Sequence, residues 1–200
     1  SEFVSIVSHQ LRSPLSNLKW SVEFLLSGRA GALGLKQAEY IGSVKENTSR
    51  MVALVTDLLK VSRIEQGAFF VTPKPFSMNR LIHETAESFA SYAKAHNVEI
   101  VLGADISMPS ISADPEKTKW VLENLIDNAI RYSDGGSVVT VTLMLRGNAI
   151  RCEVQDAGVG IPLSDQKYIF QKFFRSKNAL RHETEGSGLG LYIAKAYIEK

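Results

Sequence analysis

Hydrophobic positions in the first third of the chain recur at helical spacing in two runs. The first run has apolar residues three and four positions apart, as on one face of a helix: Phe3, Val7, Leu11, Leu15, Leu18, Val22 and Leu25. Gly28, Gly31 and Gly34 interrupt it, and a second run then ends near Gly67: Ala38, Ile41, Val44, Thr48, Met51, Val55, Leu58 and Leu59. The pattern predicts a helical hairpin over residues 1–67. Because one hairpin buries its two stripes poorly, we expect a homodimer whose two hairpins form a four-helix bundle.

The rest of the chain alternates between helical and strand patterns. Residues 68–77 carry Pro73 and Pro75 and are typical of a linker with a short extended piece. Helices are predicted over 78–96, over 114–132 and from about 189, with Asp114 as N-cap and Pro115 in the first turn of the second. Strands are predicted over 98–102, over 139–144 and up to Asp156. We therefore expect a multidomain chain, an all-α hairpin followed by an α+β domain over 78–200. The chain stops inside the last predicted helix, so we expect this domain to be C-terminally incomplete.

Composition narrows the choice of protein class only a little. The chain has 200 residues, 44% of them hydrophobic, and a net charge of +2 from 23 basic and 21 acidic residues. Lysine and arginine form no block, so we expect no nucleic-acid partner. No apolar run is long enough to span a bilayer. The single cysteine, Cys152, cannot form an intrachain disulfide, which fits a reducing compartment.

A histidine lies on the polar side of the first predicted helix. At about 100° per residue, the apolar stripe lies about 160–220° away from His9. His9 is therefore predicted to face solvent, where a neutral imidazole can act as a nucleophile. Pro14 predicts a kink one turn beyond it. Taken alone, His9 reads as an ordinary surface histidine.

Two aromatic residues, Trp20 and Phe24, fall on the same side of this helix as His9. Exposed aromatic residues often mark an interface. The alternative, packing inside the bundle, is equally compatible with the pattern.

Three short motifs with glycines or amides follow in the second part. Asn124, Asn128 and Arg131 share one helix face, where amide oxygens can ligate Mg²⁺ and a guanidinium can pair with phosphate. Asp156 precedes a turn with Gly158 and Gly160. Glycines at 186, 188 and 190 lead into the last helix, whose N-terminus favours an anion. The third motif is neither a Rossmann fingerprint nor a P-loop.

The segment Ser8-His9-Gln10-Leu11-Arg12-Ser13-Pro14-Leu15 resembles the H-box of histidine kinases, usually Ser-His-Glu-Leu-Arg-Thr-Pro-Leu. The three later motifs resemble the N, G1 and G2 boxes of the histidine-kinase ATPase domain, and residues 169–175 resemble its F-box. The five boxes stand in the family order over almost the whole chain. The resemblance implies a four-helix dimerisation domain and an ATP-binding sandwich of the gyrase, chaperone and histidine-kinase type. The related gyrase and chaperone ATPases lack the H-box hairpin, which argues against that reading.

The resemblance also implies a role for each matching residue. His9 would be the phosphoacceptor, Asn128 the Mg²⁺ ligand with Asn124 beside it, and Asp156 the acceptor of the adenine amino group. The remaining nucleotide contacts would come from Arg131, Tyr132, Gly158, Gly160, Ile161, Lys172, Phe173, Gly186, Ser187, Gly188, Leu189 and Gly190. Residues 173–187 would form a mobile lid. The implied cofactors are ATP and Mg²⁺, and the implied reaction is autophosphorylation of His9 followed by transfer to a response-regulator aspartate.

Gln10 departs from the family pattern. The usual acidic residue is thought to polarise the imidazole or accept its proton, whereas a glutamine oxygen can accept a hydrogen bond but no proton. General-base help is worth about 10²–10⁴-fold in rate. The alternative hypothesis is therefore a silenced kinase, a nucleotide-binding dimer or scaffold. Ser13 stands where the family places a residue that orients water for dephosphorylation of the regulator, so a phosphatase role is also open.

The family resemblance extends to partners and location. It implies that a response-regulator receiver domain docks near His9, and Trp20 and Phe24 are assigned to that surface or to contact with the ATP-binding domain. It also implies the cytoplasmic portion of a membrane-anchored sensor kinase, tethered only through N-terminal regions outside this sequence.

Overall fold

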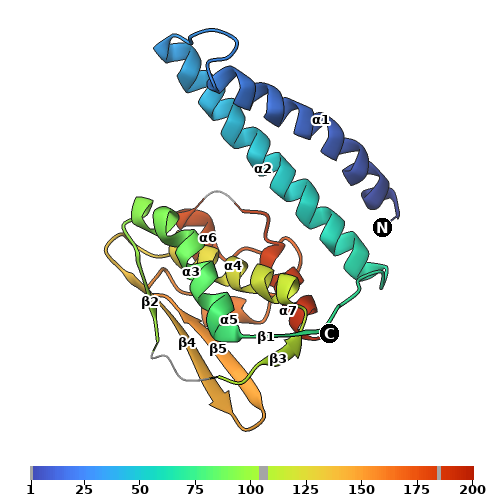
Figure 1. Ribbon diagram of the computed structural model, residues 1–200, viewed down its shortest axis with the longest axis vertical. Helices are drawn as coiled ribbons and strands as arrows, with labels where there is room; N and C mark the ends of the chain where they lie inside the picture. The colour runs from blue at the N-terminus through green and yellow to red at the C-terminus, as the bar shows by residue number, and fades with distance from the viewer. Residues whose placement is uncertain (1, 104–107, 184–185) are drawn as a thin grey trace. The chain divides into compact units, whose positions relative to one another are not determined.

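The computed structural model describes residues 2–103, 108–183 and 186–200, apart from the side chains of residues 2–6, Ser8 and His9. The chain divides into two compact units, Ser1–Phe69 and Phe70–Lys200. The predicted sequence of an all-α hairpin and an α+β domain is confirmed (Figure 1).

The first unit is a hairpin of two long helices, α1 (Glu2–Leu26) and α2 (Leu35–Glu65). Glycines make the turn between them, with φ of 75° at Gly28 and 112° at Gly31, a region open to glycine at little cost. The backbone N–H of Gly34 donates to Oε1 of Gln37 at 2.9 Å, which satisfies one donor at the start of α2.

The hairpin buries only part of its apolar stripes. Val22 of α1 and Val55 and Leu59 of α2 are buried. On the α1 stripe, Leu11 and Leu18 remain 44% and 42% exposed. α2 exposes further apolar side chains: Tyr40, Val44, Met51 and Leu54. A single hairpin thus leaves an apolar strip in water, as the sequence pattern predicts.

The second unit is built from short elements in an α+β order. Its strands are β1 (Lys74–Phe76), β2 (Glu99–Leu102), β3 (Ile111–Ala113), β4 (Val138–Arg146) and β5 (Ala149–Gln155). Its helices are α3 (Met78–Ala95), α4 (Pro115–Arg131), α5 (Leu163–Gln166), α6 (Lys177–His182) and α7 (Gly190–Ile198). The three long helices lie where the sequence predicts them. The short elements β3, α5 and α6 are additional, because segments of three to six residues leave no periodic pattern to detect.

One layer of helices packs on a three-stranded sheet. The strand order is β2-β4-β5, with β2 parallel and β5 antiparallel to β4. Val139 and Val141 of β4 turn one face inward, and Ile126 and Ile130 of α4 are fully buried in the same cluster. α3 and α4 supply the helical side of this core (Figure 1). The sheet therefore serves as a platform that holds α4 rigidly.

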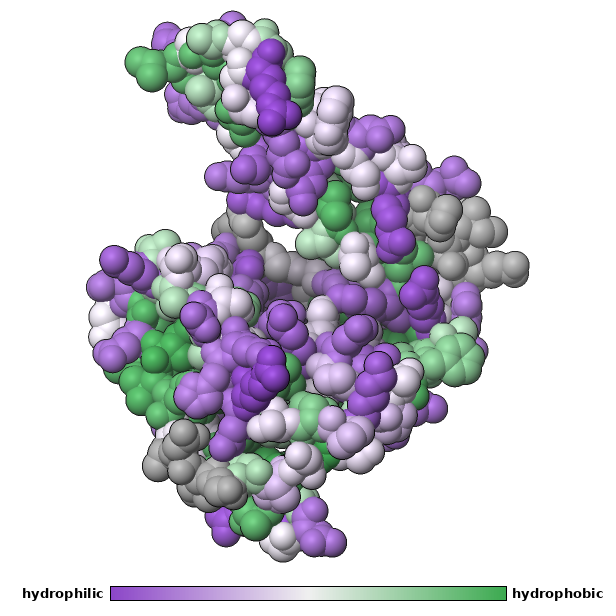
Figure 2. Space-filling view, viewed as in Figure 1, coloured by the Kyte–Doolittle hydropathy of each residue, from purple (hydrophilic) through white to green (hydrophobic). Residues whose placement is uncertain are grey.

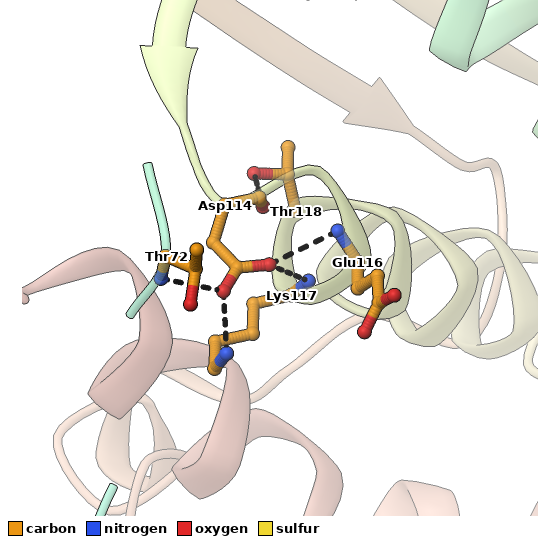
Figure 3. A network of polar contacts seen from close by, with 5 residues as sticks. All are labelled: Thr72, Asp114, Glu116, Lys117 and Thr118. Carbon is orange, nitrogen blue, oxygen red and sulfur yellow. Dashed lines mark hydrogen bonds and ion pairs between the residues drawn. The ribbon is translucent and has the colours of Figure 1, made fainter. Parts of the chain in front are cut away.

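Asp114 joins the start of the second unit to the N-terminus of α4. Its Oδ1 accepts the backbone N–H groups of Glu116 and Lys117, both at 3.1 Å, so the predicted N-cap is confirmed. Its Oδ2 accepts the backbone N–H of Thr72 at 3.0 Å and pairs with the Lys117 ammonium (Figure 3). β1 also pairs with β3, antiparallel. Residues 70–77, expected to be linker, thus belong to the second unit by these contacts.

Burial alone would raise the pKa of the Asp114 carboxyl. Hydrogen bonds from the Lys117 side chain, from the Thr72 backbone and from the Lys117 backbone outweigh burial, and the Lys117 charge adds to them. The pKa of Asp114 is lowered to about 2. The carboxylate is therefore ionised at neutral pH and stabilises the fold in that form.

Candidate active site

The second half of α4 carries two adjacent asparagine amides. Nδ2 of Asn128 donates to Oδ1 of Asn124 at 3.3 Å, and both side chains are half-buried. The Asn124 amide also lies against Gly190, the first residue of α7. A Cβ at position 190 would overlap that amide, so a side chain there would displace the Asn124 side chain. The N-box and G2-box residues therefore meet at the junction of α4 and α7.

The loop after β5 is attached to the end of α4. The N–H of Gly158 donates to Oδ1 of Asp156 at 2.9 Å, which closes a tight turn. The next N–H, of Val159, donates to the carbonyl of Tyr132 at 3.1 Å. A side chain at Gly158 would overlap that same carbonyl. The G1 box thus lies beside the C-terminus of α4, with Asp156 exposed at its edge.

The F-box and the G2 box meet through their backbones. The N–H of Phe173 donates to the carbonyl of Gly188 at 2.9 Å. Both residues have positive φ, 63° for Phe173 and 65° for Gly188. A Cβ on Gly188 would fall 2.7 Å from the carbonyl carbon of Phe173. Beyond this crossing, Leu189 is fully buried, with its N–H donating to Oγ of Ser187. This backbone contact between Phe173 and Gly188, here called the neck, brings the two ends of segment 174–187 together.

Segment 174–187, which makes up all but the first residue of the lid expected over 173–187, contains the short helix α6. Ser176 caps that helix through its Oγ, which accepts the N–H of Ala179 at 3.2 Å. Nδ2 of Asn178 donates to the carbonyl of Val159 at 3.1 Å, which joins α6 to the G1 loop. The Arg175 guanidinium donates to the carbonyl of Glu183. Residues 184 and 185 lie outside the described residues, and mobility of the segment stays a prediction.

Arg131 has a carboxylate partner that the sequence analysis missed. Its Nη2 donates to Oδ2 of Asp127 at 3.0 Å and to Oδ1 at 3.3 Å. Burial lowers the pKa of Arg131, while the charges of Asp127 and Tyr92, the Asp127 hydrogen bond and the Glu183 charge raise it above its usual value. The i,i+4 spacing of aspartate and arginine on one predicted helix was the available signal.

The remaining expected contacts surround this cluster. The Lys172 ammonium lies 5.5 Å from the centre of the Tyr192 ring of α7. The Tyr132 and His182 rings are 6.5 Å apart. Gly160 has a φ of 63°, and Ile161 beyond it is 43% exposed. Gly186 has a φ of 135° and lies against the Arg175 guanidinium.

The H-box lies in the N-terminal half of α1. The backbone of His9 is helical, but its side chain lies outside the described residues, so its predicted direction stays a prediction. Gln10 and Ser13 are exposed, and α1 continues through Pro14. One turn and more beyond, Trp20 and Phe24 stack with ring centres 5.5 Å apart and planes 14° apart. Trp20 is 67% exposed, so this pair lies at the hairpin surface.

A groove of about 790 Å³ lies elsewhere in the second unit, between α3 and β2. Ala86, Ala90 and Ala93 of α3 line it together with Ile100 and Leu102 of β2. In Figure 2, hydrophobic residues gather at the left of the unit, where Figure 1 places β2. None of the sequence-predicted site residues lines this groove, so size alone does not locate the site.

Comparisons with known families match both units. Residues 1–67 match the His Kinase A (phospho-acceptor) domain. Residues 113–200 match the histidine kinase-, DNA gyrase B-, and HSP90-like ATPase family. The circadian input-output histidine kinase CikA of Synechococcus elongatus is 30% identical over 200 residues, which cover 99% of this chain and 26% of that protein. The sensor histidine kinase GacS of Pseudomonas protegens is 29% identical over 205 residues, covering 100% of this chain and 22% of that protein.

Solved structures agree with these matches. Full-length ShkA in complex with AMPPNP superimposes with a TM-score of 0.81 at 25% identity, over 98% of this chain and 40% of that one. The catalytic domain of histidine kinase ThkA matches with a TM-score of 0.57 at 30% identity, over 64% of this chain and 80% of that one. The chain spans about a quarter of the two curated relatives. With a phosphoacceptor hairpin followed by a nucleotide-binding ATPase domain, the chain belongs to the sensor histidine kinases of two-component systems.

Proposed function

We propose that this chain uses Mg·ATP to phosphorylate His9 and passes the phosphoryl group to an aspartate of a response regulator. The observation that carries the proposal is the convergence of four separate motifs on the C-terminal half of α4. Asn124 lies against Gly190, Tyr132 holds the Gly158–Val159 loop, and Phe173 holds Gly188. Residues far apart in sequence thus frame one nucleotide site, and the H-box lies on the separate hairpin.

The amide pair on α4 suits a divalent cation that also binds phosphate oxygens. Mg²⁺ favours oxygen ligands and keeps several positions for water and phosphate. Asn128, with Asn124 in hydrogen-bond contact, offers such oxygens within a half-buried setting. When bound there, Mg²⁺ would neutralise charge that develops on the transferring phosphoryl group.

The other residues would act by binding and positioning. Asp156 is exposed and uses Oδ1 in its turn, and its carboxylate would accept a hydrogen bond from the adenine amino group. Arg131 and Lys172 would face phosphate oxygens, since guanidinium and ammonium groups pair with them. The glycines at 158 and 188 are required by packing within the protein, because any side chain there would strike a neighbouring backbone, and a side chain at 190 would displace the Asn124 amide.

In the transfer step, a ring nitrogen of His9 attacks the γ-phosphorus, an N–P bond forms, and the bond to the β,γ-bridging oxygen breaks to release ADP. Most of the rate should come from alignment and charge neutralisation. Gln10 would fix the imidazole tautomer through its amide oxygen, while the ring proton leaves to solvent. A rate below that of an enzyme with a carboxylate at position 10 follows.

The proposal includes two partners. A second copy would cover an apolar strip of α1 and α2, as expected of a four-helix bundle. The strip consists of Leu11, Leu18, Tyr40, Val44, Met51 and Leu54. A receiver domain would contact the stacked Trp20 and Phe24, which lie at the hairpin surface beyond His9. ATP is a cytoplasmic substrate, so we place this portion on the cytoplasmic side of a membrane-anchored sensor. Among the described residues, no helix is both long and apolar enough to cross a membrane.

The decisive experiment is incubation with Mg²⁺ and γ-labelled ATP, with His9→Ala and Gln10→Glu in parallel. We expect acid-labile, base-stable label in the parent chain, none in His9→Ala, and faster labelling in Gln10→Glu. Asn128→Ala serves as a nucleotide-site control and should abolish labelling while His9 is intact. Label in Gln10→Glu but none in the parent would instead identify a kinase silenced by Gln10.

A further inference from the structure

Asp127, Arg131 and Tyr92 form a polar cluster between α4 and α3. Asp127 and Arg131 are one helical turn apart on α4, and the Arg131 Nη2 contacts both carboxylate oxygens at 3.0 and 3.3 Å. Their side chains are 30% and 25% exposed, which makes this a partly desolvated pair. Tyr92 of α3 is close enough to this carboxylate for the two groups to interact. The carboxylate is thus held by the Arg131 guanidinium and faces a tyrosine from the neighbouring helix.

The Tyr92 hydroxyl is kept protonated by its surroundings. Burial and the Asp127 charge raise its pKa, the Arg131 charge lowers it, and the Glu183 charge and the Asp127 hydrogen bond raise it further. The net pKa of Tyr92 lies above its usual value. Tyr92 therefore stays a neutral phenol at neutral pH, and the charge of Glu183, at the end of α6, also acts on this cluster.

The guanidinium has donors that the cluster does not use. Arginine offers five N–H donors in a planar fork. Within the described part of the chain, the buried Nε of Arg131 has no hydrogen-bond partner. A buried donor without an acceptor costs free energy, so such a group is commonly explained by a ligand or water that supplies the acceptor. Because Asp127 holds one side of the Arg131 guanidinium, the other N–H donors of that group keep a fixed orientation.

The place of this fork in the site indicates what it would bind. Asn128 stands one turn before Arg131 on α4, and Tyr132, the next residue, holds the G1 loop by its carbonyl. Glu183, the C-cap of α6, is close enough for its charge to act on Arg131. Arg131 therefore lies between the amide pair, the G1 loop and segment 174–187, where the proposed nucleotide would place its anionic part.

We infer that Asp127 is a positioning residue that orients the Arg131 guanidinium toward the phosphates of the bound nucleotide. This inference rests on the proposed nucleotide site and adds a specific claim to it. Asp127 does not touch the ligand. It acts through Arg131, so its removal should weaken only the part of affinity that depends on phosphate.

The test compares ADP with adenosine as ligands in calorimetric titrations with Mg²⁺ present. The dissociation constant of adenosine divided by that of ADP isolates the phosphate-dependent part of binding. We expect Arg131→Gln to lower that ratio about tenfold, the value of one charge-assisted hydrogen bond. Asp127→Asn should lower it about fivefold. The variant that carries both Asp127→Asn and Arg131→Gln should bind ADP no more weakly than Arg131→Gln alone, because Asp127 acts through Arg131.

Glu123→Gln is the matched control. It removes the same charge from the same helix, where Glu123 pairs with Lys119 at 3.8 Å on an exposed surface. Its ratio should equal that of the parent. Thermal unfolding of each variant separates positioning from loss of fold.

The outcomes distinguish this inference from the proposed function. An unchanged ratio in Asp127→Asn, or equal losses for ADP and adenosine, would overturn the positioning role and leave the nucleotide site standing. Additive losses in the double variant would also overturn it. A parent chain that binds neither ligand would overturn the nucleotide site itself, and this inference with it.

Discussion

The two units solve the problem of burying apolar side chains in opposite ways. The α+β unit closes its core on its own, with Ile126, Ile130 and Val139 fully buried. The hairpin buries Val22 but leaves Leu18 42% exposed on the same stripe. A hairpin can complete its core only with another surface, whereas a sheet covered by helices is already complete. Stability should therefore depend on protein concentration in one unit and not in the other.

The chain carries one fluorescent reporter, a tryptophan, in each of its two units. Its two tryptophans are Trp20 in the hairpin and Trp120 in α4. Replacing one by phenylalanine leaves the fluorescence of the other to follow its own unit.

The largest effect is expected from Ile126→Ala in the self-contained unit. This side chain is 0% exposed, and removing it should lower the free energy of unfolding by about 2–5 kcal/mol. Urea unfolding followed by Trp120 in a Trp20→Phe background measures the loss. The loss should be the same at low and high protein concentration. A concentration-dependent midpoint for Trp120 would show that the second unit is not self-contained.

The next effect concerns the hairpin. Leu18→Glu places a charge in the strip that a second copy would cover, and we expect the dimer dissociation constant to rise roughly 100-fold. Sedimentation equilibrium measures it. Leu35→Glu is the control, because Leu35 is 93% exposed at the start of α2. Equal constants for Leu18→Glu and the parent would mean that the strip is not the dimer interface.

A smaller effect is expected at Asp114, and it should depend on pH. Asparagine can still cap α4 but cannot pair with Lys117, so Asp114→Asn should cost about 2 kcal/mol at pH 7. The folded pKa of about 2 lies below 3.8, the usual pKa of an aspartate. The advantage of the parent is therefore complete above the unfolded pKa and is lost as pH falls toward the folded pKa.

Urea midpoints of the parent and Asp114→Asn at several pH values check this prediction. Asp134→Asn, an exposed carboxylate in the same unit, should show little difference at any pH. A difference between the urea midpoints of the parent and Asp114→Asn that persists unchanged at pH 2 would rule out the ionised carboxylate as its source.

Sequence patterns were sufficient for the features that depend on nearby residues. The long helices followed from apolar periodicity, and the cap at Asp114 followed from the Asp-Pro pair. The order of the five boxes led to the family. These signals come from residues close together in the sequence, so they can be recognised without knowledge of the fold.

Features made by distant residues were not visible in the sequence. The Asp114 bond to Thr72 spans 42 positions, and the overlap that a side chain at Gly190 would make depends on Asn124. Arg131 was assigned to phosphate without its partner, although the spacing to Asp127 was readable. In each case the pairing was set by tertiary packing rather than by local preference.

The neck between Phe173 and Gly188 has a consequence for how this protein family can diversify. A loop whose ends are already held together loses little stability when it is lengthened, about 0.6 kcal/mol for each doubling. Segment 174–187 can therefore gain or lose residues while α7 and the sheet stay in place. We expect this segment to accept new sequences and lengths without a new fold.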